Sequence, residues 1–256
     1  ADAARAWLDG RLLWVFTLAI VMLGLSAAAG GRLTVAIGAR ATAYLASVLF
    51  CSGMAIAGLA IEAENAALLF AGYGIISGIG LGLGYVAPIQ LLVDWFPDRR
   101  GLATGLAITG FGGGAILATP LSSALIGVFQ SETSSGVGQA LIALAAIYAV
   151  IMLAACRGFR HPPTPEESPE EPAFDAGSAL RAPQFYLMWI LLLINVVTGI
   201  NLFASAPDVL GLAMGRGALA VEIAGFVALL GVSNMAGRFL IAAASDYLVR
   251  NHTVAL

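Results

Sequence analysis

The sequence has 256 residues, of which 60% are hydrophobic and only 11% are charged. An average soluble domain has roughly 25% charged residues, and in water this chain would expose apolar patches too large for it to stay monomeric. The composition therefore excludes an ordinary soluble domain and predicts an all-α, polytopic membrane protein, whose apolar surface faces lipid. The net charge of -3 adds little, because the position of each charge along the chain matters more.

Apolar runs predict the membrane-spanning helices, because a helix needs about 20 mostly apolar residues to cross the hydrocarbon core. Seven runs have about this length, and they lie roughly at residues 12–30, 41–61, 66–93, 102–129, 137–156, 183–207 and 218–243. Between the fifth and sixth runs, residues 157–182 are rich in proline and glutamate and cannot bury enough apolar surface to fold alone. We expect this solvated linker to separate an N-terminal helical part, residues 1–156, from a C-terminal part, residues 183–256.

The arginines predict the orientation, and the chain has no lysine. If alternate loops share a side of the membrane, eight of the arginines fall together: Arg32, Arg40, Arg99, Arg100, Arg157, Arg160, Arg181 and Arg250. The positive-inside bias makes this side cytoplasmic and places the linker there. We expect a multi-pass protein of the plasma membrane, in a bacterium the inner membrane.

Glycine is concentrated in the third run, where residues 72–84 include six glycines. A nucleotide-binding loop would need a preceding strand within a βαβ unit, which is not predicted, so close packing of helices is the better interpretation. Cys51 and Cys156 have no metal-ligand spacing around them, and the sequence predicts neither a metal nor a cofactor. No feature indicates nucleic-acid binding.

Three segments carry a resemblance to a known family. They are the loop Asp94-Trp95-Phe96-Pro97-Asp98-Arg99-Arg100-Gly101, the segment Leu180-Arg181-Ala182-Pro183-Gln184-Phe185-Tyr186, and Ser233-Asn234-Met235-Ala236-Gly237-Arg238 running on to Ser245-Asp246-Tyr247-Leu248-Val249-Arg250. Together they resemble the oxalate:formate antiporter family of the major facilitator superfamily, which is related to the monocarboxylate transporters. The resemblance implies that the seven runs are helices two to eight of a twelve-helix transporter, so that the chain is a fragment open at both ends. Residues 245–250 then correspond to the loop after helix eight.

Two loops correspond to gating motifs in this family. The superfamily motif between helices two and three carries an aspartate, which residues 31–40 lack, so we do not expect that loop to latch the helices. The second copy of this motif, after helix eight, keeps its aspartate and arginine as Asp246 and Arg250. On the same cytoplasmic side, Asp98, Arg99 and Arg100 either form a solvated charge cluster or cap the next helix and pair across a gate, with the solvated cluster favoured.

Arg238 is the leading candidate for substrate binding, because solvating its charge in lipid costs at least about 2.5 to 3.5 kcal/mol. Its planar guanidinium can hold a carboxylate through two parallel hydrogen bonds. The resemblance implies the same role, together with a lysine of helix eleven. The alternative is that Arg238, about five residues from the end of its predicted span, extends to the cytoplasmic interface.

Other polar residues within the runs are weaker candidates. Asn234 lies one helical turn before Arg238, where the related monocarboxylate transporters carry a titratable carboxylate, and an amide cannot titrate. Asn195 and Asn201 either line a cavity or hydrogen-bond between helices. The same two interpretations hold for Tyr85 and Gln90.

The favoured function is secondary transport of small mono- or dicarboxylates by alternating access, with anion exchange preferred over proton-coupled symport because of Asn234. The proton remains a possible coupling ion. A membrane-embedded enzyme is a remote alternative, because no cluster of histidine, cysteine and carboxylate lies at membrane depth. A third possibility is that a chain lacking helix one and helices nine to twelve is inactive by itself.

Overall fold

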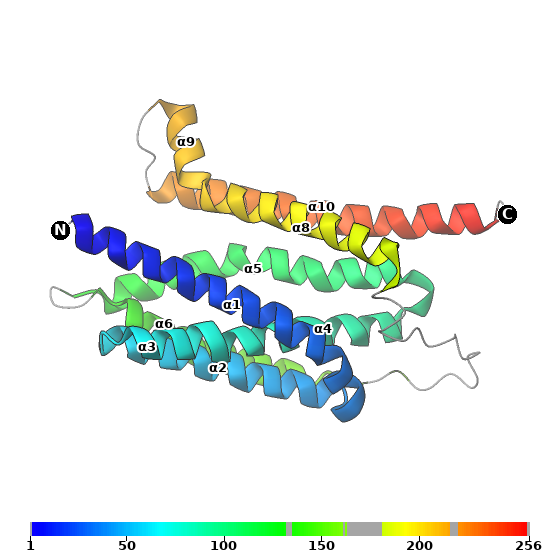
Figure 1. The fold of residues 1–256 in the computed structure, drawn as a ribbon, viewed down its shortest axis with the longest axis horizontal. Coiled ribbons are helices and arrows are strands. Elements are labelled where there is room, and N and C mark those ends of the chain that lie inside the picture. Colours follow the sequence, from blue (N-terminus) through cyan, green and yellow to red (C-terminus); the bar gives the residue numbers. More distant parts are fainter. Residues whose placement is uncertain (1, 132–134, 161, 163–180, 216–219, 255–256) are drawn as a thin grey trace. The chain divides into compact units, whose positions relative to one another are not determined.

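A computed structural model describes residues 2–131, 135–160, 162, 181–215 and 220–254, and Figure 1 shows its helices. The helical elements are α1 (Asp2–Ile37), α2 (Ala39–Glu62), α3 (Ala66–Leu69), the π-helix η1 (Phe70–Ser77), α4 (Gly78–Trp95), the 3-10 helix η2 (Pro97–Arg99), α5 (Arg100–Phe129), α6 (Val137–Cys156), α8 (Pro183–Ala204), α9 (Ala206–Met214) and α10 (Ala220–Val254). The described residues include no strand, and the predicted runs fall on helical elements. The run at residues 66–93 is divided among α3, η1 and α4, and the run at residues 183–207 ends inside α9. The prediction of an all-α helical protein is confirmed.

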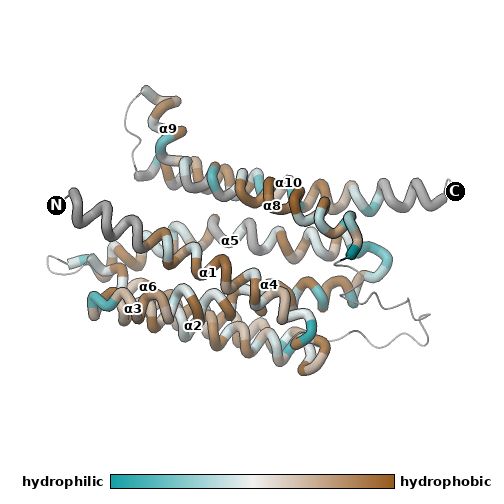
Figure 2. The backbone as a smooth tube through the Cα atoms, viewed as in Figure 1, coloured by the Kyte–Doolittle hydropathy of each residue, from teal (hydrophilic) through white to brown (hydrophobic). Residues whose placement is uncertain are grey.

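Five described helical segments are long and apolar enough to cross a membrane: Leu12–Ile37, Ala39–Glu62, Ala66–Trp95, Val137–Cys156 and Gly225–Tyr247. In the two other predicted spans, the described apolar stretches are shorter, at Ile116–Phe129 and Pro183–Gly199. Figure 2 shows hydrophobic residues along the helices and hydrophilic residues gathered at helix ends and connections. This distribution is the one that a bilayer imposes on helices that cross it.

Two parts of the C-terminal region differ from the prediction. Helix α9 occupies residues 206–214, where we expected the span to end and a connection to begin. Residues 245–250, expected to form a loop after helix eight, continue α10 as helix to Val254. That expectation was wrong because the segment contains no glycine or proline, so its backbone can extend the helix.

The chain divides into two compact units, one formed by residues 1–162 with 236–256 and the other by residues 163–235. Most of the predicted linker, at residues 161 and 163–180, lies outside the described residues. The division into two transporter halves on either side of this linker stays a prediction.

Within the first unit, α4 packs against α1, α2 and α5, and α6 packs against α2 and α5. Glycines make the contacts of α4 close. A Cβ atom on Gly80 would overlap the backbone of Phe50 in α2, and one on Gly82 would overlap Ser26 in α1. The Ser77 hydroxyl adds a hydrogen bond of 2.9 Å to the carbonyl oxygen of Phe50. The glycine-rich run is therefore a close-packed helix interface.

Candidate functional site

The N-terminus of α5 is bound by a carboxylate from a distant part of the chain. The N–H of Gly101 donates a hydrogen bond of 2.9 Å to Oδ1 of Asp246, and the N–H of Leu102 donates one of 2.6 Å to Oδ2. The first N–H groups of a helix have no partner within the helix, and the helix dipole attracts negative charge to this end. Asp246 therefore caps α5 with both of its oxygens.

Small residues allow α5 and α10 to approach each other at this point. A Cβ on Gly101 would lie 2.7 Å from the Ser245 hydroxyl and would overlap the carboxylate of Asp246. One turn further along α5, a Cβ on Gly105 would overlap the Cβ of Ala242. The spacing of four residues on both helices places each pair on one helix face, so the cap and the close contact lie on the same faces of α5 and α10.

Arg238 continues the same face of α10, one turn before Ala242. A Cβ on Gly105 would lie 3.5 Å from the carbonyl oxygen of Arg238, so the backbone at Arg238 borders α5. Arg238 is half-buried. The apolar segment Gly225–Tyr247 extends nine residues beyond it, which at about 1.5 Å per residue corresponds to roughly 14 Å. Arg238 thus lies near the middle of the apolar segment.

The polar residues expected near Arg238 are distributed over both compact units. Asn234 is half-buried on α10, while Asn195 and Asn201 are exposed on α8. Beside them, the hydroxyl of Thr198 donates to the carbonyl of Ile194 at 2.8 Å, and that of Ser205 donates to the carbonyl of Asn201 at 2.7 Å. These two hydroxyls are thus satisfied by their own helix.

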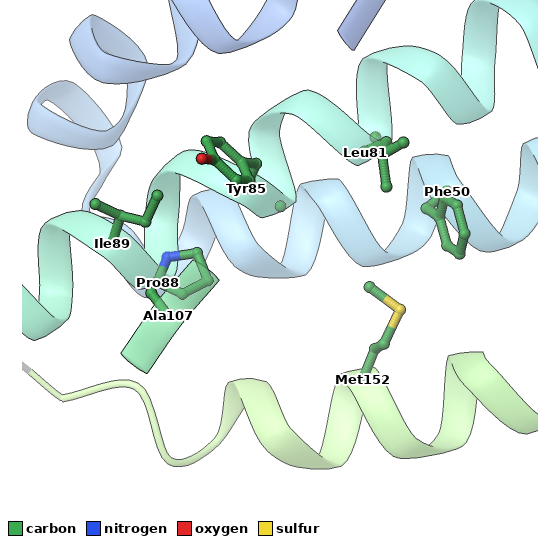
Figure 3. Close-up of a pocket in the computed structure, with 9 residues that line it drawn as sticks. Phe50, Leu81, Tyr85, Pro88, Ile89, Ala107 and Met152 are labelled. Atoms are coloured by element: carbon green, nitrogen blue, oxygen red, sulfur yellow. The ribbon is translucent and has the colours of Figure 1, made fainter. Parts of the chain in front are cut away.

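Tyr85 lines a cavity of about 210 Å³ in the first unit. Figure 3 shows this cavity between α2, α4, α5 and α6, with Phe50 and Met152 facing it from α2 and α6. Pro88 lies on the same stretch of α4 and, having no N–H, leaves the Gly84 carbonyl without the usual partner four residues on. The lining is otherwise apolar, which suits a small uncharged group better than an anion.

Gln90 is not among the residues that line this cavity. Its side-chain nitrogen would lie 3.6 Å from a Cβ on Gly31, so Gln90 occupies the contact between α4 and α1. The structure therefore does not bring Tyr85 and Gln90 together in one cavity.

The charged loop between α4 and α5 is exposed. Asp98 and Arg99 belong to η2, and the side chain of Arg99, which precedes α5, makes no capping hydrogen bond. Arg100 begins α5 and is also exposed. The amides at this helix start bind Asp246 instead. The side chain of Arg250 lies outside the described residues.

The sequence indicated Asp246 as a candidate, but it did not predict that Gly101, Leu102 and Gly105 of α5 would lie beside the end of α10 that carries it. The available signal was the spacing of small residues, Gly101 to Gly105 on one helix and Ala242 four residues before Asp246 on the other. Among the described residues, no group of three His, Cys, Asp or Glu side chains is placed to hold a metal ion.

The described residues thus include several helices long and apolar enough to cross a membrane, and an ionisable residue inside such a helix often marks a substrate or ion pathway. The sequence profile of the Major Facilitator Superfamily matches residues 9–256. The chain belongs to this superfamily, whose matched members are transporters rather than enzymes.

Three relatives illustrate the similarity. The uncharacterized MFS-type transporter YhjX of Escherichia coli is 22% identical over 99% of this chain and 62% of its own length. The oxalate:formate antiporter of Oxalobacter formigenes is 27% identical over 81% of this chain and 49% of its own length. Monocarboxylate transporter 9 of Rattus norvegicus is 33% identical over 47% of this chain and 24% of its own length. These similarities confirm the resemblance drawn from the motifs, and the chain spans under two thirds of each relative.

Proposed function

We propose that the protein transports small organic anions, mono- or dicarboxylates, by alternating access, and that Arg238 binds the carboxylate. The observation that carries the proposal is the position of Arg238 near the middle of an apolar segment, beside the interface of α10 with α5. The apolar segment continues for roughly 14 Å beyond Arg238, which is farther than an arginine side chain extends. This length argues against the alternative that the Arg238 guanidinium reaches the cytoplasmic interface. An arginine held at this depth favours an anionic ligand.

The capped interface supplies a gate in this proposal. Asp246 stabilises the approach of α5 to α10 through the amides of Gly101 and Leu102, and the gate opens when these hydrogen bonds break. By the positive-inside bias this end of the helices is cytoplasmic, as is the linker at residues 157–182. The state with the contact formed is then closed toward the cytoplasm.

The relatives support the substrate class without fixing the substrate. One is named an oxalate:formate antiporter and another a monocarboxylate transporter, and a further relative, 32% identical over 44% of this chain, is the apicoplast pyruvate carrier 1 of Toxoplasma gondii. All three names refer to small carboxylates. Asn234, which cannot titrate, favours exchange of anions over proton-coupled symport.

Uptake of radiolabelled oxalate, formate, lactate and pyruvate into proteoliposomes that contain the full-length protein tests the proposal. We expect Arg238→Gln to reduce uptake by roughly 10- to 150-fold, because a hydrogen bond to a charged group contributes about 1.5 to 3 kcal/mol. Arg238→Lys keeps the positive charge but loses the planar guanidinium, so its uptake should lie between that of the wild-type protein and that of Arg238→Gln.

The exposed Arg181 provides the matched control, since Arg181→Gln removes the same charge at the start of the segment that leads into α8. Normal uptake by Arg238→Gln would show that this arginine is not the substrate site. Absence of carboxylate uptake by the wild-type protein would contradict the transport proposal itself.

A further inference from the structure

Three exposed arginines lie with aromatic side chains where α2 begins and where α4 and α6 end, on the side assigned to the cytoplasm. They are Arg40, at the start of α2, and Arg157 and Arg160, directly after α6. None of them takes part in the proposed substrate site or gate. We propose that this cluster binds the phosphate of an anionic phospholipid from the cytoplasmic leaflet.

A buried contact joins the segment after α6 to α2 and α4. Ala43, Ala87 and Cys156 form a buried cluster, and the partly buried Tyr44 and Phe159 pack against it. The hydroxyl of Ser47 lies 3.5 Å from the sulfur of Cys156 and adds a polar contact to the same junction. Residues 157–160 are thereby held close to the start of α2, which brings Arg157 and Arg160 into the neighbourhood of Arg40.

Two specific contacts fix the arginines further. The guanidinium of Arg40 lies 5.9 Å from the centre of the Tyr44 ring. A guanidinium over an aromatic face keeps its N–H donors at the edge of its plane, where they can bind an anion. The indole Nε1 of Trp95 donates a hydrogen bond of 2.7 Å to the carbonyl oxygen of Arg160, which fixes the backbone from which that side chain extends.

The surroundings suit a lipid better than a soluble anion. Trp95 and Phe96 are 46% and 51% exposed, and tryptophan favours the headgroup level of a membrane. Val48, one turn along α2 from Tyr44, is 55% exposed and continues the face toward the membrane interior. An amphiphile can thus place its phosphate at the arginines and an acyl chain along α2.

The charge at this corner is also favourable. The described carboxylates nearest in sequence to Trp95 are Asp94 and Asp98, so two carboxylates stand against the three arginines. Basic clusters on the cytoplasmic side of membrane helices attract anionic lipids by about 1 kcal/mol per basic residue. One kcal/mol corresponds to about a fivefold change in affinity. Removing all three arginines should therefore weaken binding by roughly 100-fold.

Native mass spectrometry of the full-length protein, titrated with phosphatidylglycerol and with phosphatidylcholine, tests the proposal. We expect the wild-type protein to bind phosphatidylglycerol in preference, and Arg40→Gln/Arg157→Gln/Arg160→Gln to lose that preference. The matched control is Arg32→Gln, which removes an exposed arginine at the end of α1 and should change binding by less than twofold.

A second variant keeps the charge and hence the orientation signal. Trp95→Phe removes the hydrogen bond to Arg160 while leaving every arginine in place, and we expect a loss of several-fold in phosphatidylglycerol affinity. This variant also tests the proposal if the triple variant fails to insert into the membrane.

Three results would overturn the proposal. One is equal loss of lipid binding in Arg32→Gln and in the triple variant, which would assign the effect to general surface charge. Another is unchanged binding in the triple variant and in Trp95→Phe. The third is full competition by soluble glycerol phosphate at the same concentration as the lipid, which would assign the site to a free phosphate instead.

Discussion

Asp246 connects two helices through one carboxylate, because each of its oxygens accepts a backbone N–H of α5. An aspartate in this position acts twice, as a hydrogen-bond acceptor and as a negative charge at the positive end of a helix dipole. The neighbouring Asp98, although closer in sequence, lies in η2 and is exposed. The two aspartates therefore predict different outcomes when each is replaced.

We expect Asp246→Ala to release the first turn of α5. Two amides lose a charged acceptor, and hydrogen bonds of this kind contribute about 1.5 to 3 kcal/mol each. Hydrogen exchange followed by mass spectrometry should show at least about tenfold faster exchange in the peptide that contains Gly101 and Leu102. Asp246→Asn, which keeps one acceptor oxygen, should show a smaller effect. Asp98→Asn is the control, and a similar acceleration in that variant would contradict the assignment of the cap to Asp246.

Replacing Asn234 by a titratable residue should make the proposed anion site sensitive to pH. An aspartate at this position would lie four residues before Arg238, a spacing at which opposite charges pair on a helix. We expect Asn234→Asp to inhibit anion uptake at neutral pH, because the new carboxylate competes with the substrate for Arg238.

The sign of the pH effect follows from protonation. The introduced carboxyl has an ordinary pKa of about 3.9, and the adjacent arginine favours its charged form, so it stays charged near neutral pH and uptake by Asn234→Asp should recover only when the pH falls below about 4. Proteoliposome uptake at a series of pH values measures this, with Asn234→Gln as the uncharged control. Equal pH profiles for both variants would indicate that residue 234 does not act on the substrate site.

Among the helical elements, α5 and α10 meet through residues too small to keep them apart. Gly105 faces Ala242, whereas Gly110, on the same helix, has nothing within 4 Å of the position that a Cβ would take. This difference gives a matched pair of substitutions within one helix. We expect Gly105→Ala to push α10 away and accelerate hydrogen exchange at the start of α5, as Asp246→Ala does.

Gly110→Ala should leave both exchange and uptake near the wild-type values, because its methyl group meets open space. Both substitutions replace a helical glycine by alanine, which by itself stabilises a helix by about 1 kcal/mol. Any difference between them therefore reports the contact with α10. Equal behaviour of the two variants would show that the close approach of α5 and α10 has no functional consequence.

The sequence predicts most of the helices, because a helix that crosses a bilayer must be apolar over about 20 residues, a requirement visible in single runs. Residues 137–156 are predicted and observed with the same limits. The π-helix η1 and the short helix α9 were not predicted. The sequence of η1 has no pattern that distinguishes it from an α-helix, and that of α9 has none that distinguishes it from a connection. The extension of α10 to Val254 was missed because the family resemblance implied a loop at residues 245–250.

The candidate site was predictable only in part, for a physical reason. Arg238 stands out because a charged residue inside an apolar segment is costly, and Asp246 stands out through the resemblance to the family's motif after helix eight. The groups that Asp246 binds are backbone amides, which every residue except proline carries and which leave no mark in a sequence. A pairing across more than 140 residues, such as that of Asp246 with Gly101, requires the fold to be known.

At the scale of the whole molecule, the proposed role of Arg238 has a consequence for the transport cycle. A bound carboxylate adds a negative charge beside the guanidinium, which lowers the cost of moving that positive charge through a medium of low dielectric. The site should therefore change sides readily when loaded and slowly when empty, which is the behaviour of an exchanger.

We accordingly expect proteoliposomes loaded with unlabelled carboxylate to take up the labelled anion at least about tenfold faster than unloaded vesicles, if the empty site costs only about 1.4 kcal/mol more to move. An acidic exterior should not drive accumulation in unloaded vesicles, since Asn234 offers no group to protonate. A protonophore serves as the control and should leave exchange in loaded vesicles unchanged. Accumulation in unloaded vesicles that depends on an inward proton gradient, and that the protonophore abolishes, would instead establish proton-coupled symport and require a titratable group elsewhere in the transporter.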